Sequence, residues 1–176
     1  MVEIAVKYLE STTGARLAAG DPDRMCRGVT IDSRAVEPDA IFVAFPGERV
    51  DGNDFALKAI ELGAGAVVMT RDPEDEVVAM ARERGCAVLT CDDPTEFLLR
   101  LAQGYRARLR CTVIGVTGSI GKTTTKDVLA ACLSKRYRVH ATAGNYNNLI
   151  GLPLTILSAP ADTQMLVLEM GMNDFG

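Results

Sequence analysis

The hydrophobic and polar positions of the first 107 residues alternate between short apolar runs and helical spacing. Apolar runs rich in β-branched residues predict four strands, at 28–32, 40–45, 64–69 and 86–90. Apolar spacing of three and four predicts three helices, at 55–62, 77–84 and 93–102. A glycine follows each of the first two helices and favours a stop there. This part of the chain is therefore predicted to form a small α/β domain.

From residue 108 the pattern becomes a regular alternation of strand and helix. The predicted elements are a strand at 111–116, a helix at 121–135, a strand at 138–142, a short helix at 151–158 and a strand at 165–169. The first run is apolar enough for a buried strand. Such alternation implies a parallel sheet with right-handed crossovers. The fold class is therefore α/β, with a second domain at 108–176 after a first at 1–107.

A basic stretch precedes the second domain, formed by Arg106, Arg108 and Arg110. We interpret it as a solvated connector, because exposed charge clusters are usually surface. A phosphate-gathering role is the alternative.

Composition narrows the class of protein. The chain has 176 residues, of which 48% are hydrophobic, so it has enough apolar residues for one domain or two small ones. No apolar run approaches the ~20 residues of a membrane span, and the N-terminus lacks the pattern of a signal peptide, so a cytoplasmic location is expected. The net charge of −4 and the absence of tryptophan argue against a nucleic-acid surface.

The cysteines and the single histidine do not suggest a metal centre. The five cysteines are odd in number and include no C-x-x-C pair, so we interpret them as buried, reduced thiols. His140 has no ligand spacing around it and is interpreted as a residue at a strand end.

The segment between the predicted strand at 111–116 and the next helix is typical of a phosphate-binding loop. Its residues are Thr117, Gly118, Ser119, Ile120, Gly121, Lys122, Thr123 and Thr124. Glycines allow backbone N–H groups to approach phosphate oxygens, while Lys122 supplies a cation and Thr123 a hydroxyl that can ligate Mg²⁺. The commonest P-loop pattern requires glycine at the position of Val116, so the strand–loop–helix context carries the prediction. A glycine-rich turn is the alternative.

Two further stretches should reach the same edge of the second sheet. Glu169 ends the strand at 165–169, where its carboxylate can ligate Mg²⁺ together with Thr123; a solvent-facing acid is the alternative. The loop at 144–148 concentrates amides, which suit a substrate with amide and hydroxyl groups. Ordinary turn chemistry explains that loop equally well.

Polar groups also follow two predicted strands of the first domain, at 30–34 and 45–52. Such loops are natural ligand positions, although the residues alone favour ordinary loop composition.

Taken together, these blocks resemble the Mur ligase family over nearly the whole chain. The resemblance rests on D-S-R at 32–34, I-F-V-A-F-P-G-E-R-V-D-G at 41–52, T-G-S-I-G-K-T-T-T-K at 117–126, G-N-Y-N-N-L-I-G-L-P-L-T at 144–155 and E-M-G-M-N at 169–173. It implies an N-terminal domain that binds a UDP-sugar peptide and a central ATPase domain. Ile120 departs from the family, which often has a small polar residue there.

The resemblance also implies roles for individual residues. The UDP-sugar side is assigned Ser33, Arg34, Gly47, Asp51 and Gly52. In the ATPase domain, Lys122 would hold the β- and γ-phosphates of ATP, Thr123 and Glu169 would hold Mg²⁺, and Asn145 and Asn148 would line the junction between ATP and the peptide carboxylate.

The implied activity is a ligation in peptidoglycan precursor synthesis. It joins UDP-N-acetylmuramoyl-tripeptide to D-Ala-D-Ala through an acyl phosphate, in an enzyme expected to be monomeric. The family continues beyond the equivalent of residue 176, so we expect these residues alone not to complete the reaction. A non-catalytic module that binds UDP-sugar and nucleotide is the alternative. A P-loop kinase or GTPase would need an N-K-x-D motif or a lid, and neither is visible.

Overall fold

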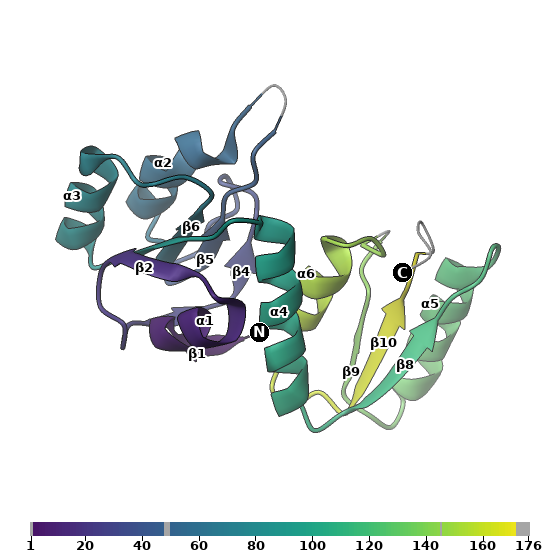
Figure 1. The fold of residues 1–176 in the computed structure, drawn as a ribbon. Helices are drawn as coiled ribbons and strands as arrows, with labels where there is room; N and C mark the ends of the chain where they lie inside the picture. The colour runs from purple at the N-terminus through teal and green to yellow at the C-terminus, as the bar shows by residue number, and fades with distance from the viewer. Residues whose placement is uncertain (1, 48–49, 145, 172–176) are drawn as a thin grey trace. The chain divides into compact units, whose positions relative to one another are not determined.

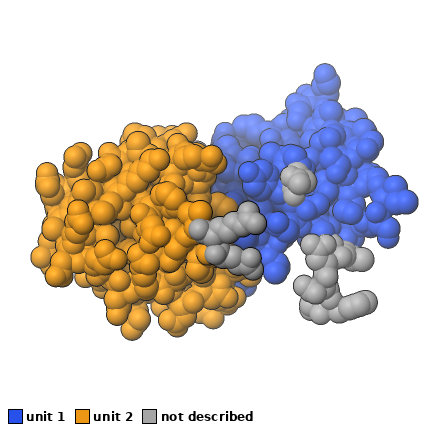
Figure 2. All heavy atoms as spheres, turned by 90° about the horizontal axis from the view of Figure 1, so that it is seen from above, with its two compact units in different colours: residues 1, 102–176 blue, residues 2–101 orange. Residues whose placement is uncertain are grey.

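A computed structural model describes residues 2–47, 50–144 and 146–171, and it divides the chain into two compact units. Residues 2–101 form one unit and residues from 102 onwards form the other (Figure 2). The division falls inside helix α4 (Pro94–Arg108), and the domain boundary near residue 107 stays a prediction. Within the described residues, no helix combines the length and the apolar character that a membrane span requires.

The first unit is built around a five-stranded sheet with the order β2-β7-β6-β5-β4 (Figure 1). Its strands are β2 (Arg16–Ala19), β4 (Val29–Thr30), β5 (Ile41–Val43), β6 (Ala66–Met69) and β7 (Ala87–Thr90). Strands β4 to β7 run parallel, and β2 pairs antiparallel with β7. The four predicted strands of this unit are therefore present, and its α/β class is confirmed.

The helices of this unit cover its sheet, which explains why the central strands consist of continuous apolar residues. The 3₁₀-helix η1 (Gly52–Phe55) leads into α2 (Ala56–Glu61), and α3 (Asp75–Arg84) follows β6. Apolar residues of α2 and α3 form one buried cluster with Phe42, Val67 and Val88 of the sheet. Every residue of β5, β6 and β7 is buried, as parallel strands covered on both faces require.

The first 27 residues contain four elements that the sequence pattern did not predict. They are β1 (Glu3–Ala5), α1 (Val6–Thr13), β2 and β3 (Met25–Arg27). Strand β1 pairs antiparallel with β3, with Ile4 opposite Cys26. Strands of three or four residues are too short to show a period, and their pairing partners lie far along the chain.

The second unit contains a parallel three-stranded sheet with the order β8-β10-β9 (Figure 1). Its strands are β8 (Thr112–Val116), β9 (Val139–Ala141) and β10 (Met165–Glu169), and its helices are α5 (Lys122–Leu133) and α6 (Gly151–Ser158). The predicted parallel sheet is confirmed. The chain passes from the edge strand β8 to the other edge strand β9 and then returns to the central strand β10. Figure 1 shows α5 and α6 on opposite sides of the sheet.

Two expectations for this region need correction. Strand β8 was predicted to be buried, yet it is an edge strand of the sheet and Val113 is 37% exposed. Helix α4 was predicted to end at 102 but continues to Arg108, so Arg106 and Arg108 of the basic stretch lie in its last turn. Positive side chains are favourable there because the C-terminal end of a helix carries partial negative charge. Arg108 and Arg110 are exposed, as expected for a solvated stretch.

The cysteines are all free thiols, but not all are buried. Burial raises the pKa of Cys26 to about 11, that of Cys86 to about 12 and that of Cys91 to about 11. Cys132 is exposed on α5, so its interpretation as a buried thiol is wrong. His140 lies in the middle of β9 rather than at its end, and burial lowers its pKa.

Candidate functional site

The loop between β8 and α5 has the backbone geometry of an anion site. Gly118 has a φ of +140° and Gly121 a φ of +81°, values that side-chain-bearing residues rarely adopt. Helix α5 starts at Lys122, directly after the second glycine. The first N–H groups of a helix have no partner within it, so they are available to a phosphate.

The side chains of this loop leave its backbone accessible. Thr117, Ser119, Thr123 and Thr124 are exposed, Gly118 is half-buried, and Ile120 is 95% exposed. The Nζ atom of Lys122 donates to the backbone oxygen of Gly118 at 2.7 Å. The ammonium group therefore lies against the loop, and the unusual isoleucine points its bulk into solvent.

The carboxylate of Glu169 lies next to this loop because β10 is the direct neighbour of β8. Glu169 is in register with Val116, and the N–H of Met170 donates to the oxygen of Val116 at 2.9 Å. The hydroxyl of Thr123 donates to Oε1 of Glu169 at 3.1 Å. Two residues that are distant in sequence are thus brought together by the strand order.

The surroundings of Glu169 fit a cation. The residue is 2% exposed, and its Oε2 atom is buried without a hydrogen-bond partner among the described residues. An unpaired buried carboxylate oxygen is costly unless a cation or donor meets it. A carboxylate beside a threonine hydroxyl supplies the hard oxygen atoms that Mg²⁺ prefers.

The amide-rich loop divides into residues with different tasks. The Oδ1 atom of Asn148 accepts from the N–H groups of Ile150 at 3.1 Å and Gly151 at 2.7 Å, which caps the start of α6. The Nδ2 atom of Asn147 donates to Oε1 of Glu169 at 2.9 Å. Asn145 lies outside the described residues. Sequence reasoning assigned roles to Asn145 and Asn148 and none to Asn147, whose only signal was its place in the loop.

Lys126 is a second residue near the site to which sequence reasoning gave no role. Its side chain is buried, and its Nζ atom donates to the backbone oxygen of Thr142 at 2.7 Å. The hydroxyl of Thr142 accepts from the backbone N–H of Glu169 at 2.9 Å. Lys126 therefore fixes the end of β9 on which the Glu169 backbone rests. Its signal was a second lysine one helical turn after Lys122.

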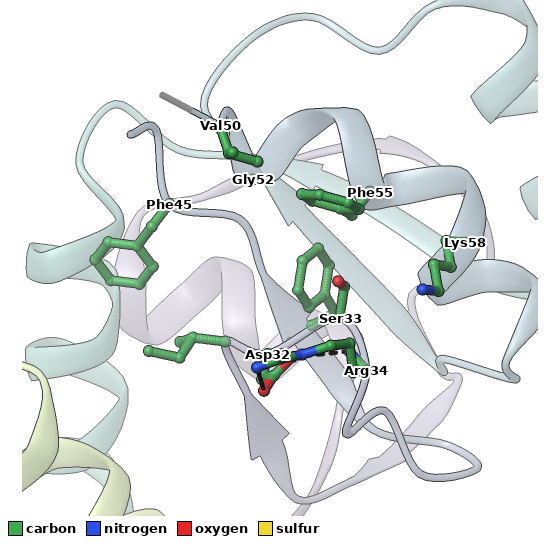
Figure 3. Close-up of a pocket in the computed structure, with 10 residues that line it drawn as sticks. Asp32, Ser33, Arg34, Phe45, Val50, Gly52, Phe55 and Lys58 are labelled. Atoms are coloured by element: carbon green, nitrogen blue, oxygen red, sulfur yellow. Dashed lines mark hydrogen bonds and ion pairs between the residues drawn. The ribbon is translucent and has the colours of Figure 1, made fainter. Parts of the chain in front are cut away.

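The first unit contains a pocket at the carboxyl ends of β4 and β5 (Figure 3). Its volume is about 520 Å³, and it is lined by Ile31, Asp32, Ser33, Arg34, Phe42, Phe45, Val50, Gly52, Phe55 and Lys58. Three aromatic rings give it an apolar wall, Lys58 gives it positive charge, and the charge of Arg34 is paired with the carboxylate of Asp32, which also lines the pocket. Ser33, Arg34 and Gly52 were predicted site residues, whereas Lys58 and the aromatic residues were missed.

Two other predicted residues of this region do not line the pocket. The Oδ1 atom of Asp51 accepts from the backbone N–H and Nδ2 of Asn53 at 2.9 and 2.7 Å, and its Oδ2 atom is 3.3 Å from Arg71. Asp51 thus caps η1. Gly47 precedes Glu48 and Arg49, which lie outside the described residues, and a Cβ atom on Gly47 would be 2.6 Å from the oxygen of Val50.

Arg34 and Asp32 form a forked ion pair beside the pocket (Figure 3). The Nε and Nη2 atoms of Arg34 donate to the two carboxylate oxygens at 2.9 and 2.8 Å. These hydrogen bonds, together with one from the backbone N–H of Arg34, lower the pKa of Asp32 to about 2.

The Asp32–Arg34 pair is expected to survive mild acid. The side chain of an aspartate in an unfolded chain has a pKa of about 3.9. Because the pKa is lowered in the folded chain, any stability from the pair is fully present above that value and is lost as the pH falls towards about 2. A ¹³C NMR titration of the side-chain carboxyl should give a midpoint near 2. A midpoint near 4 would show that the fork is not formed in solution.

These features define an α/β unit with a loop of the P-loop type, joined in one chain to a second α/β unit with its own pocket. Two family models agree with that class. "Mur ligase family, catalytic domain" matches residues 26–106, and "Mur ligase middle domain" matches residues 116–176. The chain belongs to the Mur ligase family.

Curated relatives and solved structures agree. The chain is 41% identical to the UDP-N-acetylmuramoyl-tripeptide--D-alanyl-D-alanine ligase of Bacillus subtilis, over 100% of this chain and 37% of that protein. The ligase of the same name from Treponema pallidum is 39% identical over 93% of this chain and 36% of its own length. A crystal structure of MurF from Acinetobacter baumannii matches with a TM-score of 0.85 and 29% identity, covering 100% of this chain and 37% of that one.

A MurF ligase of Thermotoga maritima, solved in complex with ADP, also matches. Its TM-score is 0.69 and its identity 35%, over 82% of this chain and 32% of that chain. The chain thus spans about one third of the length of these relatives.

Proposed function

We propose that the second unit binds ATP with Mg²⁺ as one half of a peptide-ligase site. The observation that carries the proposal is the buried Oε2 atom of Glu169, which has no hydrogen-bond partner among the described residues and lies in the carboxylate that Thr123 contacts at the end of the phosphate-binding loop. Lys122 would neutralise the β- and γ-phosphates, and the helix start would hold them through its N–H groups. Thr123 and Glu169 would hold Mg²⁺, which supplies charge neutralisation at the phosphates when bound.

We propose that the reaction is the one in the relatives' name, the ligation of UDP-N-acetylmuramoyl-tripeptide to D-Ala-D-Ala. The carboxylate that ends the peptide of UDP-N-acetylmuramoyl-tripeptide takes the γ-phosphoryl group of ATP. This activation is needed because a carboxylate is a poor electrophile. The amine of D-Ala-D-Ala then attacks the acyl phosphate, and the products are an amide, phosphate and ADP. The chain's own contribution is mainly positioning and charge neutralisation by Lys122. Asn145 and Asn148 are proposed to lie near the reacting carboxylate.

We further propose that the pocket of the first unit holds the UDP-sugar. Its volume falls within the range of about 300–1,000 Å³ found for small-molecule sites. The aromatic side chains offer a surface for a base or a sugar, while Lys58 suits a diphosphate, and Arg34 would reach one with the donors that it does not use on Asp32. Ser33 and Gly52 line the same pocket, and Asp51 and Gly47 would shape the loop around it. ATP and the UDP-sugar are intracellular nucleotides, so the proposal includes a cytoplasmic location. A monomeric enzyme stays a prediction.

Calorimetric titration of the 176-residue chain tests these assignments separately. ATP should bind more tightly with Mg²⁺ than with EDTA, and UDP-N-acetylmuramoyl-tripeptide should bind with ATP absent. A P-loop kinase would bind ATP and ignore the UDP-sugar. Absence of UDP-sugar binding would overturn the assignment of the first unit, and absence of ATP binding would overturn that of the second.

A further inference from the structure

The two carboxylate oxygens of Glu169 have different surroundings. Oε1 accepts two hydrogen bonds, from Asn147 at 2.9 Å and from Thr123 at 3.1 Å. Oε2 is buried and has no partner within the described part of the chain. The carboxylate is therefore held through one oxygen, and the other is presented without a hydrogen bond.

The two donors to Oε1 are not equivalent. The hydroxyl of Thr123 rotates, can both donate and accept, and is the group proposed to bind the cation. The amide nitrogen of Asn147 can only donate. If the oxygen of Thr123 turned to a cation, the hydrogen bond from Asn147 to Oε1 could remain. The amide would then restrain the rotation of the carboxylate with and without the cation.

The backbone near both residues is fixed by other contacts. The backbone oxygen of Asn147 accepts from the N–H of Gly171 at 2.8 Å, and the N–H of Glu169 donates to Thr142. Lys126 in turn holds the backbone oxygen of Thr142. Removing the Asn147 side chain therefore leaves the strand end in place and releases only the carboxylate.

We propose that Asn147 is a positioning residue for the magnesium–nucleotide site, which directs Oε2 of Glu169 towards the cation by donating to Oε1. The inference rests on the proposed function. It assigns Asn147 an action through Glu169 and no direct part in the reaction. Hydrogen-bond partners of metal ligands typically change metal affinity by about 10- to 100-fold when removed.

The test compares ATP affinity with Mg²⁺ and with EDTA in the full chain carrying Asn147→Ala or Asn147→Leu. The leucine variant keeps the side-chain volume without the donor. For each protein, the dissociation constant of ATP in EDTA divided by that in Mg²⁺ measures the contribution of the cation. We expect this ratio to fall by about tenfold or more in both variants, while the affinity in EDTA stays the same. Gln164→Ala is the control, because Gln164 is a side-chain amide of the same unit that accepts from the backbone N–H of Arg138 and has no hydrogen bond to Glu169 among those of the described residues.

The outcomes separate the two levels of the proposal. An original chain whose ATP affinity does not depend on Mg²⁺ would overturn the metal site itself. A Mg²⁺-dependent original chain with unchanged ratios in the Asn147 variants would overturn only the role of Asn147. An equal loss of affinity in Mg²⁺ and EDTA would also overturn it, since a general structural role predicts that pattern. Thermal unfolding of each variant without ligand confirms that the proteins compared are folded.

Discussion

Replacing Glu169 with glutamine is expected to abolish the Mg²⁺ dependence of ATP binding, so that the ratio of dissociation constants in EDTA and Mg²⁺ falls to about one. The glutamine keeps the volume and can still accept from Asn147 and Thr123. It loses the negative charge, and with it the attraction that holds a divalent cation. Affinity in EDTA should not fall, because a carboxylate near the phosphate loop repels the nucleotide when no cation lies between them.

The same substitution is expected to stabilise the ligand-free chain. The carboxylate accepts hydrogen bonds from Asn147 and Thr123 through Oε1, but its buried Oε2 atom has no partner among the described residues. A neutral amide in its place is less costly to bury than a charge. We expect the free energy of unfolding to rise by on the order of 1 kcal/mol in urea denaturation. Asp162→Asn is the matched control, because Asp162 is an exposed carboxylate of the same unit that pairs with Arg138. Unchanged Mg²⁺ dependence in Glu169→Gln would refute the assignment of Glu169 as a metal ligand.

Gly52→Ala is expected to destabilise the first unit and to weaken its UDP-sugar binding together. A Cβ atom at Gly52 would lie 2.5 Å from the oxygen and 2.6 Å from the nitrogen of Phe45. Both are backbone atoms, so the clash cannot be relieved by a side-chain rotation, and the hydrogen bond from the N–H of Gly52 to that oxygen would be strained. Overpacking of this kind costs about 1–3 kcal/mol, and we expect the upper part of this range.

The effect on binding follows because Phe45 and Gly52 both line the pocket. Moving them apart should weaken UDP-N-acetylmuramoyl-tripeptide binding by about tenfold, or ~1.4 kcal/mol. Gly85→Ala is the comparison, because Gly85 has a φ of +66° with no atom within 4 Å of an added Cβ. That variant should cost only about 1 kcal/mol of backbone strain and leave binding unchanged. If Gly52→Ala binds and unfolds like the original chain, the close backbone approach does not persist in solution.

Local pattern was sufficient to predict most of the fold. Runs such as 64–69 and 86–90 read as strands because parallel strands buried on both faces need unbroken apolar sequence. Helices ending at Gly63 or Gly85 were readable because a glycine stop is a property of the backbone itself. The pattern failed at β1 and β3, where each strand has three residues and pairs with residues 20 to 24 positions away along the chain.

The candidate site was predictable only in part, for a related reason. Lys122 and Thr123 are adjacent in sequence and directly follow the glycine loop, and spacing alone places them at the start of a helix. The tasks of Asn147 and Lys126 depend on which atoms they meet, and those atoms belong to other segments. The pocket of the first unit shows the same limit, because Lys58 comes from a helix while Ser33 comes from a loop.

By itself the sequence determined an α/β chain with a phosphate-binding loop between a strand and a helix, since those features follow from contacts between neighbours along the chain. Only the tertiary structure decided that β10 lies between β8 and β9, which sets Glu169 opposite Val116 at the loop. It also decided that one carboxylate oxygen is paired and the other is buried without a partner within the described residues. The order of strands and the solvation of a single oxygen depend on packing between segments that are distant in sequence. Local periodicity reports only on contacts between neighbours along the chain, so it cannot predict that packing.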